Sequence, residues 1–457
     1  MGKYFGTDGF RGEAGVSLTA RHAYRIGRFL GYHYAKNGRR ARLVIGKDTR
    51  LSSYMLEYAL VAGVTSSGAD AYMLHVTTTP SVSFVTASED FDGGVMISAS
   101  HNPYTDNGIK LVNTRGEKES DALQDQIEQY LDDAYPLPTG ARDLPYARGE
   151  AIGRIVDYAA GRNRYIGYLI SLSLHSFKGF RVALDCANGS AWMIAKSVFD
   201  ALGAKTYLLG ASPDGLNINR GCGSTHPEAL SRFVRENRLD AGFAFDGDSD
   251  RCIAVDESGA LVNGDHILYL LAVEMKRRGE LRGNAVVATV MSNLGLRQAL
   301  AREGIGYEET QVGDRFVYER MQEGGFAIGG EQSGHIILSK YATTGDGILT
   351  AIKIMEAMIS SKMPLSSLAA PMKMLPQALC NLRVRDKEAA VSHPHVKEAF
   401  EKIEGALMGS GRILLRKSGT EPLVRVMVEA TEQQICDRYV KEVASLFRTL
   451  GLTEDTE

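Results

Sequence analysis

The 457-residue chain is poor in cysteine, and its cysteines lie far apart. There are five, an odd number, and no two of them form a Cys-x-x-Cys pair. They are Cys186, Cys222, Cys252, Cys380 and Cys436. This pattern indicates neither a disulfide framework nor a thiolate zinc site, and it is typical of a protein from a reducing compartment. We therefore expect a cytoplasmic protein.

Long apolar runs and an excess of one charge are also missing. No stretch is long and apolar enough to span a membrane. The first residues, Met-Gly-Lys-Tyr-Phe-Gly, contain no apolar signal region and lack the Ser or Thr that a myristoylation signal prefers at the sixth position. With 52 basic and 55 acidic residues, the net charge of -3 gives no electrostatic case for nucleic acid or an acidic membrane as a partner. Small-molecule chemistry is the class that remains favoured.

Short apolar strands alternate with helical segments along most of the chain. Strand-like stretches cover 43–46, 181–185 and 285–290, and a helical pattern follows each of them. After the first stretch, this pattern rests on the spacing of Met55, Ala59 and Ala62. The alternation predicts an α/β protein with sheets rich in parallel pairing, and the wide spacing of the units suggests three related domains.

Prolines and changes of pattern divide the chain into four predicted domains. Prolines between 136 and 145 follow an amphipathic stretch, a second boundary lies near Glu257, and a third lies among the prolines of 364–376. The last part has a strand pattern at 423–428 and a closing helix pattern at 434–447, unlike the earlier units. The predicted domains are 1–150, 151–256, 257–368 and 369–457.

Three aspartates on alternate residues, Asp246, Asp248 and Asp250, form the most informative pattern. Carboxylates packed so closely repel one another unless a hard divalent cation or a comparable positive charge lies between them. A metal site is therefore the first hypothesis. The alternative is a solvated acidic turn beside Arg251.

A calcium loop of the EF-hand type is a further alternative, because Glu257 stands at the twelfth position counted from the first aspartate. Arg251, however, occupies the sixth position, where that loop needs glycine. The flanks 241–245 and 252–255 also have the pattern of strands and not of helices. The sequence thus predicts a metal-binding loop between two strands, near a domain junction, where ligand sites are common.

The second constellation is the loop that follows the apolar run at Met96. It carries Ser98, Ser100 and His101, and Pro103 constrains it. Such a loop suits a nucleophile, although a surface turn whose hydroxyls satisfy backbone groups explains this stretch about as well. Lys110, a little further on, is a candidate acid or base only if its neighbours lower its pKa.

Two later loops carry groups suited to sugar and phosphate. The glycine-rich loop 329–335 presents Glu331 and Ser333, which suit polar sugar contacts, while a glycine turn with a capping glutamate is the alternative. The segment from Arg416 to Pro422, with Arg425 beyond it, combines arginines, hydroxyls and a glycine, as phosphate sites do. A structural explanation would instead pair these arginines with Glu421 and Glu429.

The segments 7–12, 98–103 and 246–251 occur in the order found in alpha-D-phosphohexomutases, and the resemblance spans nearly the whole chain. It implies four domains around a central cleft: three related α/β domains with mixed sheets, and a smaller α+β domain at the C-terminus. It also implies that Ser100 carries a phosphoryl group as phosphoserine, and that this group and the three aspartates bind one Mg2+ ion.

The resemblance assigns further positions to the site. It implies catalytic roles for Arg11, His101 and Lys110, and it matches Lys47 and Arg50 to basic positions that line the cleft. The implied substrate-binding residues are Arg251, Glu331, Ser333, His335, Arg416, Ser418, Gly419, Thr420 and Arg425.

Within the family, the loops around Gln332 and Gly419 are most similar to those of bacterial phosphoglucosamine mutases. Phosphoglucomutases and phosphomannomutases more often have methionine and asparagine at these two positions. Ser249 and Lys417 depart from the pattern, because glycine and proline are common there. Neither is a matched ligand, but both bear on loop stiffness.

The resemblance implies interconversion of glucosamine 6-phosphate and glucosamine 1-phosphate, with glucosamine 1,6-bisphosphate as intermediate and activator. This reaction feeds UDP-N-acetylglucosamine and cell-wall synthesis. Sugar phosphates are then the expected partners, and a homodimer is compatible with the sequence. The alternatives are a phosphoglucomutase or phosphomannomutase and, from another class, a non-catalytic calcium or sugar-phosphate binding protein.

Overall fold

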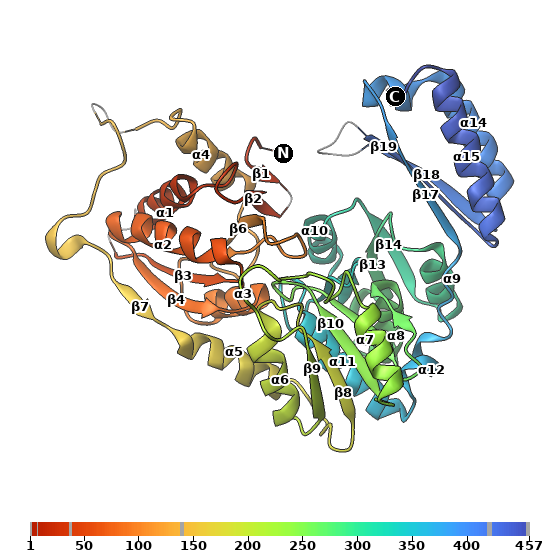
Figure 1. Cartoon of the computed structure of the whole chain (residues 1–457), viewed down its shortest axis with the longest axis horizontal. Coiled ribbons are helices and arrows are strands. Elements are labelled where there is room, and N and C mark those ends of the chain that lie inside the picture. Colours follow the sequence, from red (N-terminus) through yellow and green to blue (C-terminus); the bar gives the residue numbers. More distant parts are fainter. Residues whose placement is uncertain (1, 7, 36–38, 138–140, 418–422, 454–457) are drawn as a thin grey trace. The chain divides into compact units, whose positions relative to one another are not determined.

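The computed structural model describes residues 2–453 except 7, 36–38, 138–140 and 418–422. These residues divide into two compact units, the first made of residues up to 291 with 305–370, the second of 292–304 with the residues from 371 on. The first unit contains three mixed sheets and the second an antiparallel sheet (Figure 1). No helix among the described residues has the length and apolar character needed to cross a bilayer.

The first sheet is mixed, with strands in the order β1-β2-β6-β5-β3-β4-β7. Its centre is parallel, because β3 runs parallel to both β4 and β5, whereas β6 is antiparallel to β5 and β2. The strands are β1 (Phe5–Gly6), β2 (Gly9–Glu13), β3 (Arg42–Lys47), β4 (Asp70–Val76), β5 (Gly93–Ile97), β6 (Asp106–Val112) and β7 (Ile155–Asp157), and the helices are α1 (Ala20–Tyr34), α2 (Leu51–Ser66), α3 (Thr79–Ser88), α4 (Asp121–Leu131) and the 3-10 turn η2 (Gly149–Ala151).

Both faces of this sheet are covered, because successive side chains of a strand point to opposite sides. Leu43 and Ile45 of β3 belong to the core that includes α1, α2 and α4, whereas Val44 packs with residues of α3. Helices α1 and α2 also approach closely. A Cβ atom on Gly27 of α1 would lie 2.2 Å from the carbonyl oxygen of Leu60 in α2, so this approach requires glycine.

The second sheet has the order β12-β11-β10-β8-β9 and the third the order β14-β13-β15-β16. Both combine parallel and antiparallel pairs. The second contains β8 (Arg181–Asp185), β9 (Lys205–Leu209), β10 (Ala241–Phe245), β11 (Cys252–Asp256), β12 (Leu261–Val262), α5 (Ala159–Ser171), α6 (Ala191–Ala201) and α7 (Glu228–Glu236). The third contains β13 (Ala285–Thr289), β14 (Gly306–Thr310), β15 (Ile328–Gly330), β16 (Ile336–Leu338), α8 (Gly264–Arg277), α10 (Asp314–Gly324), α11 (Gly347–Ser361), α12 (Leu365–Ala369) and η3 (Arg282–Asn284).

The second unit has a three-stranded antiparallel sheet in the order β17-β19-β18. Its core joins this sheet to α14 and α15. Its elements are α9 (Leu294–Arg302), β17 (Gln377–Arg383), α13 (Lys387–Ser392), α14 (Pro394–Leu407), β18 (Gly411–Lys417), β19 (Leu423–Ala430) and α15 (Gln433–Thr449). An α+β arrangement is thus confirmed for the C-terminal part.

Loops that follow the C-terminal ends of strands carry three of the predicted motifs of the first unit, whereas Arg11 and Lys110 lie on β2 and β6. β5 ends at Ile97 just before the Ser100 loop, β10 ends at Phe245 just before the aspartates, and β15 ends at Gly330 just before Glu331. In open α/β sheets this is the edge where ligands bind.

The sequence predicted several elements correctly. Strands at 181–185 and 241–245 are confirmed as β8 and β10. The helix around Met55 is also confirmed, but Met55 is 41% exposed and Ala62 is exposed, because α2 buries a different set of residues. The predicted boundaries at 150 and 256 precede β7 and β12, the edge strands of the first two sheets.

Candidate active site

The Ser100 loop places a buried hydroxyl directly against the aspartate loop. Ser100 is 1% exposed, and its Oγ donates to Asp246 Oδ2 at 2.5 Å. Its backbone N–H donates to Ser98 Oγ at 2.9 Å, and its Oγ lies 3.3 Å from His101 Nδ1. The two strongest motifs of the sequence therefore form one site, although the chain separates them by 146 residues.

The three aspartates are buried in the loop between β10 and β11, with one carboxylate oxygen from each within 4.8 Å of the others. Burial and the negative charges of Asp250 and Asp248 raise the pKa of Asp246 well above its usual value. Among the described residues, Asp248 Oδ1 and Asp250 Oδ1 have no hydrogen-bond partner. Crowded carboxylates with buried oxygens left over are a donor set that fits a hard divalent cation.

Two neighbours fix the shape of the aspartate loop. Thr79, at the start of α3, donates through Oγ1 to Asp248 Oδ2 at 2.5 Å and through its backbone N–H to the Asp248 carbonyl at 3.0 Å. Ser249 has a φ of 59°, in the left-handed region that favours glycine. Ser249, which stands where glycine is common, therefore keeps the left-handed backbone of a glycine and adds a side chain.

Lys110, on β6, lies among the carboxylates. Its Nζ is 2.7 Å from Asp248 Oδ2, 3.2 Å from Asp250 Oδ2 and 3.1 Å from Asp8 Oδ2. Burial alone would lower the pKa of Lys110, but Asp248, Asp250 and Asp8 raise it well above its usual value. From the sequence, Lys110 was a candidate acid or base only if its neighbours lowered its pKa. In this arrangement they raise it, so that condition is not met.

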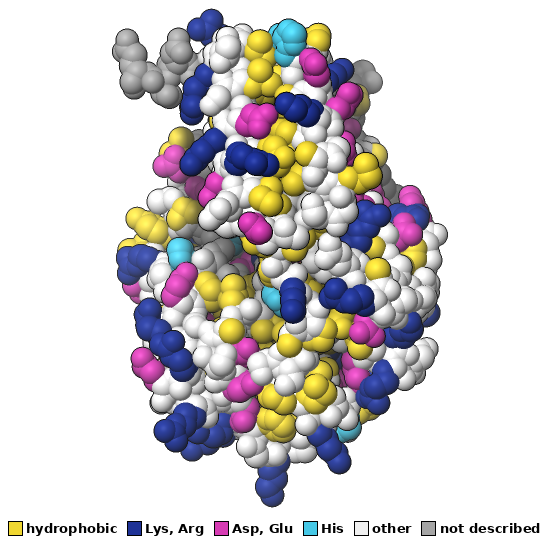
Figure 2. Space-filling view, turned by 90° about the vertical axis from the view of Figure 1, so that its right-hand side faces the viewer, with side chains coloured by type: hydrophobic (Ala, Val, Ile, Leu, Met, Phe, Trp, Pro, Cys, Tyr) yellow, Lys and Arg dark blue, Asp and Glu magenta, His cyan; other side chains and the backbone are white. Residues whose placement is uncertain are grey.

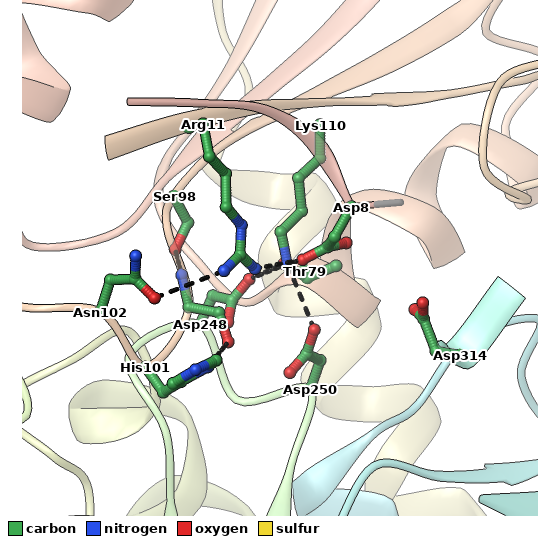
Figure 3. Close-up of polar contacts among 12 residues, drawn as sticks. Asp8, Arg11, Thr79, Ser98, His101, Asn102, Lys110, Asp248, Asp250 and Asp314 are labelled. Carbon is green, nitrogen blue, oxygen red and sulfur yellow. Dashed lines mark hydrogen bonds and ion pairs between the residues drawn. The ribbon is translucent and has the colours of Figure 1, made fainter. Parts of the chain in front are cut away.

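Arg11 and His101 flank the same cluster (Figure 3). Arg11 pairs with Asp8, and its Nη1 donates to Asn102 Oδ1 at 3.4 Å. Burial, followed by the charges of Arg251 and Arg11, lowers the pKa of His101 to about 3. The imidazole is therefore neutral at pH 7, and with so low a pKa it is a weak base.

The predicted sugar loop of the third sheet reaches the aspartates through His335. Its Nδ1 lies 3.8 Å from Asp250 Oδ2, while Nε2 accepts the backbone N–H of Gly345 at 3.0 Å. Burial alone would lower the pKa of His335, but Asp250 and Asp314 raise it to about 9. The two carboxylates thus favour a doubly protonated ring, but the backbone N–H of Gly345 points at Nε2 and leaves no room for a proton there. In this geometry the ring is therefore neutral, with its one proton on Nδ1, facing Asp250.

Glu331 and Ser333 lie in the same loop. Glu331 Oε1 accepts the backbone N–H of Gly313 at 3.2 Å, which holds the carboxylate near the start of α10. The Oγ of Ser333 is enclosed, and no described residue is its hydrogen-bond partner. Arg251 precedes β11, and its backbone N–H donates to Asp246 Oδ1 at 3.2 Å. The structure thus brings all three residues to one region of the first unit.

The predicted phosphate loop belongs to the second unit. Arg416 of β18 and Arg425 of β19 face each other in the antiparallel register. Like charges directly opposite each other are unfavourable unless an anion or an acidic group compensates them. Ser418, Gly419 and Thr420 lie outside the described residues.

Three residues that the sequence did not single out extend the charged cluster. Lys118 Nζ lies 3.0 Å from Asp8 Oδ1 and 2.6 Å from Asp314 Oδ2, so it joins the first sheet to α10. Asp8 stands inside the segment that was matched for Arg11, which was a usable signal. Lys118 and Asp314 have no distinctive neighbours in the sequence, and only the fold brings them together.

The other basic residues matched to the cleft are buried. Lys47 pairs with Glu57 at 2.5 Å, and both residues are 2% exposed. Arg50 is fully buried, pairs with Asp48, and donates to carbonyl groups of the Ser100 loop. Lys47 is thus part of a closed ion pair, whereas Arg50 supports the site.

Four family models match the sequence, in the order of the sheets along the chain. They describe phosphoglucomutase/phosphomannomutase alpha/beta/alpha domain I at residues 2–136, domain II at 163–259, domain III at 263–375 and the C-terminal domain at 379–446.

Individual proteins agree with these matches. Phosphoglucosamine mutase of Lachnospira eligens is 60% identical over 453 residues, 99% of each chain. The structure of a phosphoglucomutase/phosphomannomutase family protein from Burkholderia thailandensis has a TM-score of 0.78 at 23% identity and covers 99% of this chain and 98% of that chain. Aspergillus fumigatus N-acetylphosphoglucosamine mutase, solved in complex with GlcNAc-6P and magnesium, has a TM-score of 0.68 at 18% identity, with 98% and 96% covered. Both structures share the fold.

Proposed function

The chain belongs to the phosphoglucomutase/phosphomannomutase family, and we propose that it interconverts glucosamine 6-phosphate and glucosamine 1-phosphate. It is an intramolecular phosphotransferase of the phosphohexomutase class. The observation that carries the proposed chemistry is the contact of 2.5 Å between Ser100 Oγ and Asp246 Oδ2, in a buried cluster of three aspartates. The name of the relative at 60% identity supports the amino sugar as substrate.

We propose that Asp246, Asp248 and Asp250 hold one Mg2+ ion together with phosphorylated Ser100. The buried oxygens Asp248 Oδ1 and Asp250 Oδ1, which lack partners among the described residues, support this assignment. Magnesium in the Aspergillus fumigatus complex is consistent with it. When bound, the ion would offset negative charge as the phosphoryl group moves.

In the proposed cycle, the phosphoryl group of phosphoserine 100 passes to the free hydroxyl of the sugar phosphate. The bond from phosphorus to Ser100 Oγ breaks, a bond to the sugar oxygen forms, and the hydroxyl proton leaves with a basic group. The product is glucosamine 1,6-bisphosphate. After this intermediate turns over, its other phosphoryl group returns to Ser100 Oγ, which restores the phosphoenzyme and leaves the isomeric monophosphate.

The surrounding side chains divide the remaining tasks. Arg11 and protonated Lys110 are cations that stabilise the transferring group, since Lys110 is held in its charged form by three carboxylates. Neutral His101 lies 3.3 Å from Ser100 Oγ, within hydrogen-bond distance, and can orient this oxygen. Arg251, whose backbone already contacts Asp246, is assigned to substrate phosphate.

We assign recognition of the sugar and of its second phosphate to two different units. Glu331, Ser333 and His335 supply a carboxylate, a hydroxyl and an imidazole for ring hydroxyls. The facing arginines of β18 and β19, with Ser418, Gly419 and Thr420, would hold the phosphate that is not reacting.

Movement of the second unit would exclude water from the phosphoserine. If water had access, it would hydrolyse the phosphoserine. We propose that the proline-containing segment 364–376, already predicted as a domain boundary, is the hinge of this movement. It includes residue 371, where the C-terminal part of the second unit begins. If substrate changes neither small-angle scattering nor the amide exchange of the second unit, this part of the proposal fails.

We also propose a cytoplasmic location and a homodimer. The cysteines of the described residues are free thiols, as expected in a reducing compartment. Helix α2 presents an uncharged apolar face, with Leu51 64%, Tyr54 42%, Met55 41% and Tyr58 69% exposed, which can meet its own copy without charge repulsion. On the face drawn in Figure 2, basic and acidic side chains are scattered among hydrophobic ones. Light scattering of wild type and Tyr58→Lys tests the dimer, which the substitution should split.

The function is tested by a side-by-side assay with glucosamine, N-acetylglucosamine, glucose and mannose 6-phosphates in the presence of magnesium. We expect the highest kcat/KM for glucosamine 6-phosphate and no turnover by Ser100→Ala. Faster turnover of glucose or mannose phosphate would assign the chain to the other branches of the family. Full activity of Ser100→Ala would contradict the phosphoserine chemistry.

A further inference from the structure

Asn219 makes contacts that the proposed function leaves unused. It lies between β9 and α7 of the second sheet and is 7% exposed, and its side chain reaches the Ser100 loop of the first sheet. Its Nδ2 donates to the carbonyl oxygen of Ser100 at 3.0 Å and to that of Asn102 at 3.1 Å. An amide NH2 group has two hydrogens, so one side chain can serve both carbonyls.

Arg50, which lies between β3 and α2, donates to the same two carbonyls. Its Nη2 lies 3.1 Å from the oxygen of Ser100 and 2.6 Å from that of Asn102. Arg50 and Ser100 both belong to the first sheet, and the ion pair with Asp48 fixes Arg50 there. Of the two donors, Arg50 and Asn219, only Asn219 therefore connects the Ser100 loop to the second sheet.

The Ser100 loop needs such support because its backbone is strained. Ser100 has a φ of 52°, in the left-handed region, which costs a residue other than glycine about 1 kcal/mol. Asn219 also has a left-handed backbone, with a φ of 58°, which asparagine tolerates better than most residues. Its N–H donates to the carbonyl of Ala187 at 2.8 Å, so the amide is held ready by its own domain.

The contacts of Asn219 also set the spacing between serine and aspartates. A Cβ atom on Gly247, between two of the aspartates, would lie 2.6 Å from the Ser100 carbonyl oxygen and 3.2 Å from Asn219 Nδ2. The aspartate loop therefore packs directly against the carbonyl that Asn219 binds. A shift of this carbonyl would move Ser100 Oγ relative to Asp246.

We propose that Asn219 is a positioning residue, which holds the backbone of Ser100 so that its side chain stays aligned with the aspartates and with the acceptor hydroxyl. The proposal rests on the proposed function, because alignment matters to turnover only if Ser100 is the reacting group. A misplacement of about 1 Å reduces turnover by up to about 100-fold. Since Asn219 does not touch the sugar, KM should stay nearly constant.

The test compares Asn219→Gly, Asn219→Asp and the control Asn217→Ala. Glycine keeps the left-handed backbone and removes the amide, whereas aspartate keeps the shape but has no proton to donate to the carbonyls. Asn217 lies in the same segment but bonds only locally, with Nδ2 donating to the Ser212 carbonyl at 2.9 Å and Oδ1 accepting from Asp214 N–H at 3.1 Å. Each full-length variant is assayed for kcat and KM, and amide exchange is measured on the peptide that contains Ser100.

We expect Asn219→Gly to lower kcat by about 10- to 100-fold with KM within about twofold of wild type, and Asn219→Asp to lower kcat further. Exchange of the Ser100 peptide should be faster in both variants and unchanged in Asn217→Ala. Wild-type kcat in both Asn219 variants, an effect confined to KM, unchanged exchange, or an equal loss in Asn217→Ala would each overturn the proposal. An inactive wild type would instead refute the proposed function, while the exchange experiment would still decide the role of Asn219.

Discussion

In the first unit, the single buried aspartate Asp346 and the three buried aspartates of the loop 246–250 differ in how their charge is satisfied. Asp346 is 2% exposed and caps α11, with Oδ1 accepting the N–H of Leu349 at 2.9 Å and Oδ2 the hydroxyl of Tyr165 at 2.8 Å. Burial raises its pKa to about 6, although the hydrogen bonds from Leu349 and Tyr165 act in the opposite direction. In the loop 246–250, three carboxylates crowd together, and two of their oxygens have no partner among the described residues.

The difference separates a structural acid from a set of metal ligands. One buried carboxylate can be satisfied by neutral donors, because a helix N-terminus and a hydroxyl point at it. Three adjacent carboxylates need positive charge, and Lys110 supplies part of it in this structure. The aspartates of the loop therefore fit a cation site, whereas Asp346 fits the cap of the helix that follows it.

The largest expected effect separates the two groups by turnover. Asp248→Asn should lower kcat by about 1,000-fold, because loss of one ligand removes several kcal/mol of transition-state stabilisation. Asp346→Asn should retain turnover within about threefold, since it lies outside the cluster and an amide keeps its shape. Steady-state kinetics at saturating magnesium measure both. Equal losses in the two variants would remove the distinction.

Magnesium should stabilise the protein through the loop alone. At 100 times its dissociation constant, a ligand specific for the native state adds about 2.7 kcal/mol, which raises Tm by a few degrees. We expect this shift in wild type and in Asp346→Asn and none in Asp248→Asn. Scanning calorimetry with and without magnesium is the measurement, and a shift of equal size in Asp248→Asn would place the ion elsewhere.

Without metal, loss of one loop carboxylate should make the protein more stable than wild type. The raised pKa of Asp246 means that its ionised form is unfavourable in the folded protein. Asp246→Asn should therefore stabilise the metal-free protein at pH 7 by at least about 1 kcal/mol, since it removes a like charge. Chemical denaturation in the presence of EDTA checks this, and a destabilised variant would contradict it.

The last prediction concerns pH and Asp346. Its pKa rises from 3.8 in the unfolded chain to about 6 in the folded protein, so the folded state binds the proton more tightly. The stability this provides is complete below about pH 4 and is lost as pH rises through about 6, by roughly 3 kcal/mol. Because asparagine cannot titrate, the Tm of wild type should fall relative to that of Asp346→Asn over this range. A Tm difference independent of pH would show that Asp346 has an ordinary pKa.

Local patterns in the sequence predicted the elements well where burial is simple. The apolar runs at β8 and β10 are confirmed because strands buried on both faces have continuous apolar sequences. The spacing of Met55, Ala59 and Ala62 predicted that α2 is a helix but not which of its faces is buried, and Met55 is exposed.

The sequence revealed the motifs of the site but not the hydrogen bonds and ion pairs that join them. Ser100 and the aspartates stand in short segments whose residue types reveal their chemistry. Asn219, Lys118 and Asp314 lie far from those segments in the chain, and their roles depend on which loops meet in space. A single polar residue in a loop has no sequence signal that distinguishes it from its solvated neighbours.

Peptide mapping of Ser100 by mass spectrometry tests the central claim most directly. The protein is incubated with glucosamine 1,6-bisphosphate and magnesium, with Ser100→Ala and Asp248→Asn as controls. We expect a phosphate on Ser100 in wild type, its transfer to added glucosamine 6-phosphate, and a strongly reduced yield in Asp248→Asn. A wild-type Ser100 that stays unmodified while the sugar phosphates interconvert would contradict the account.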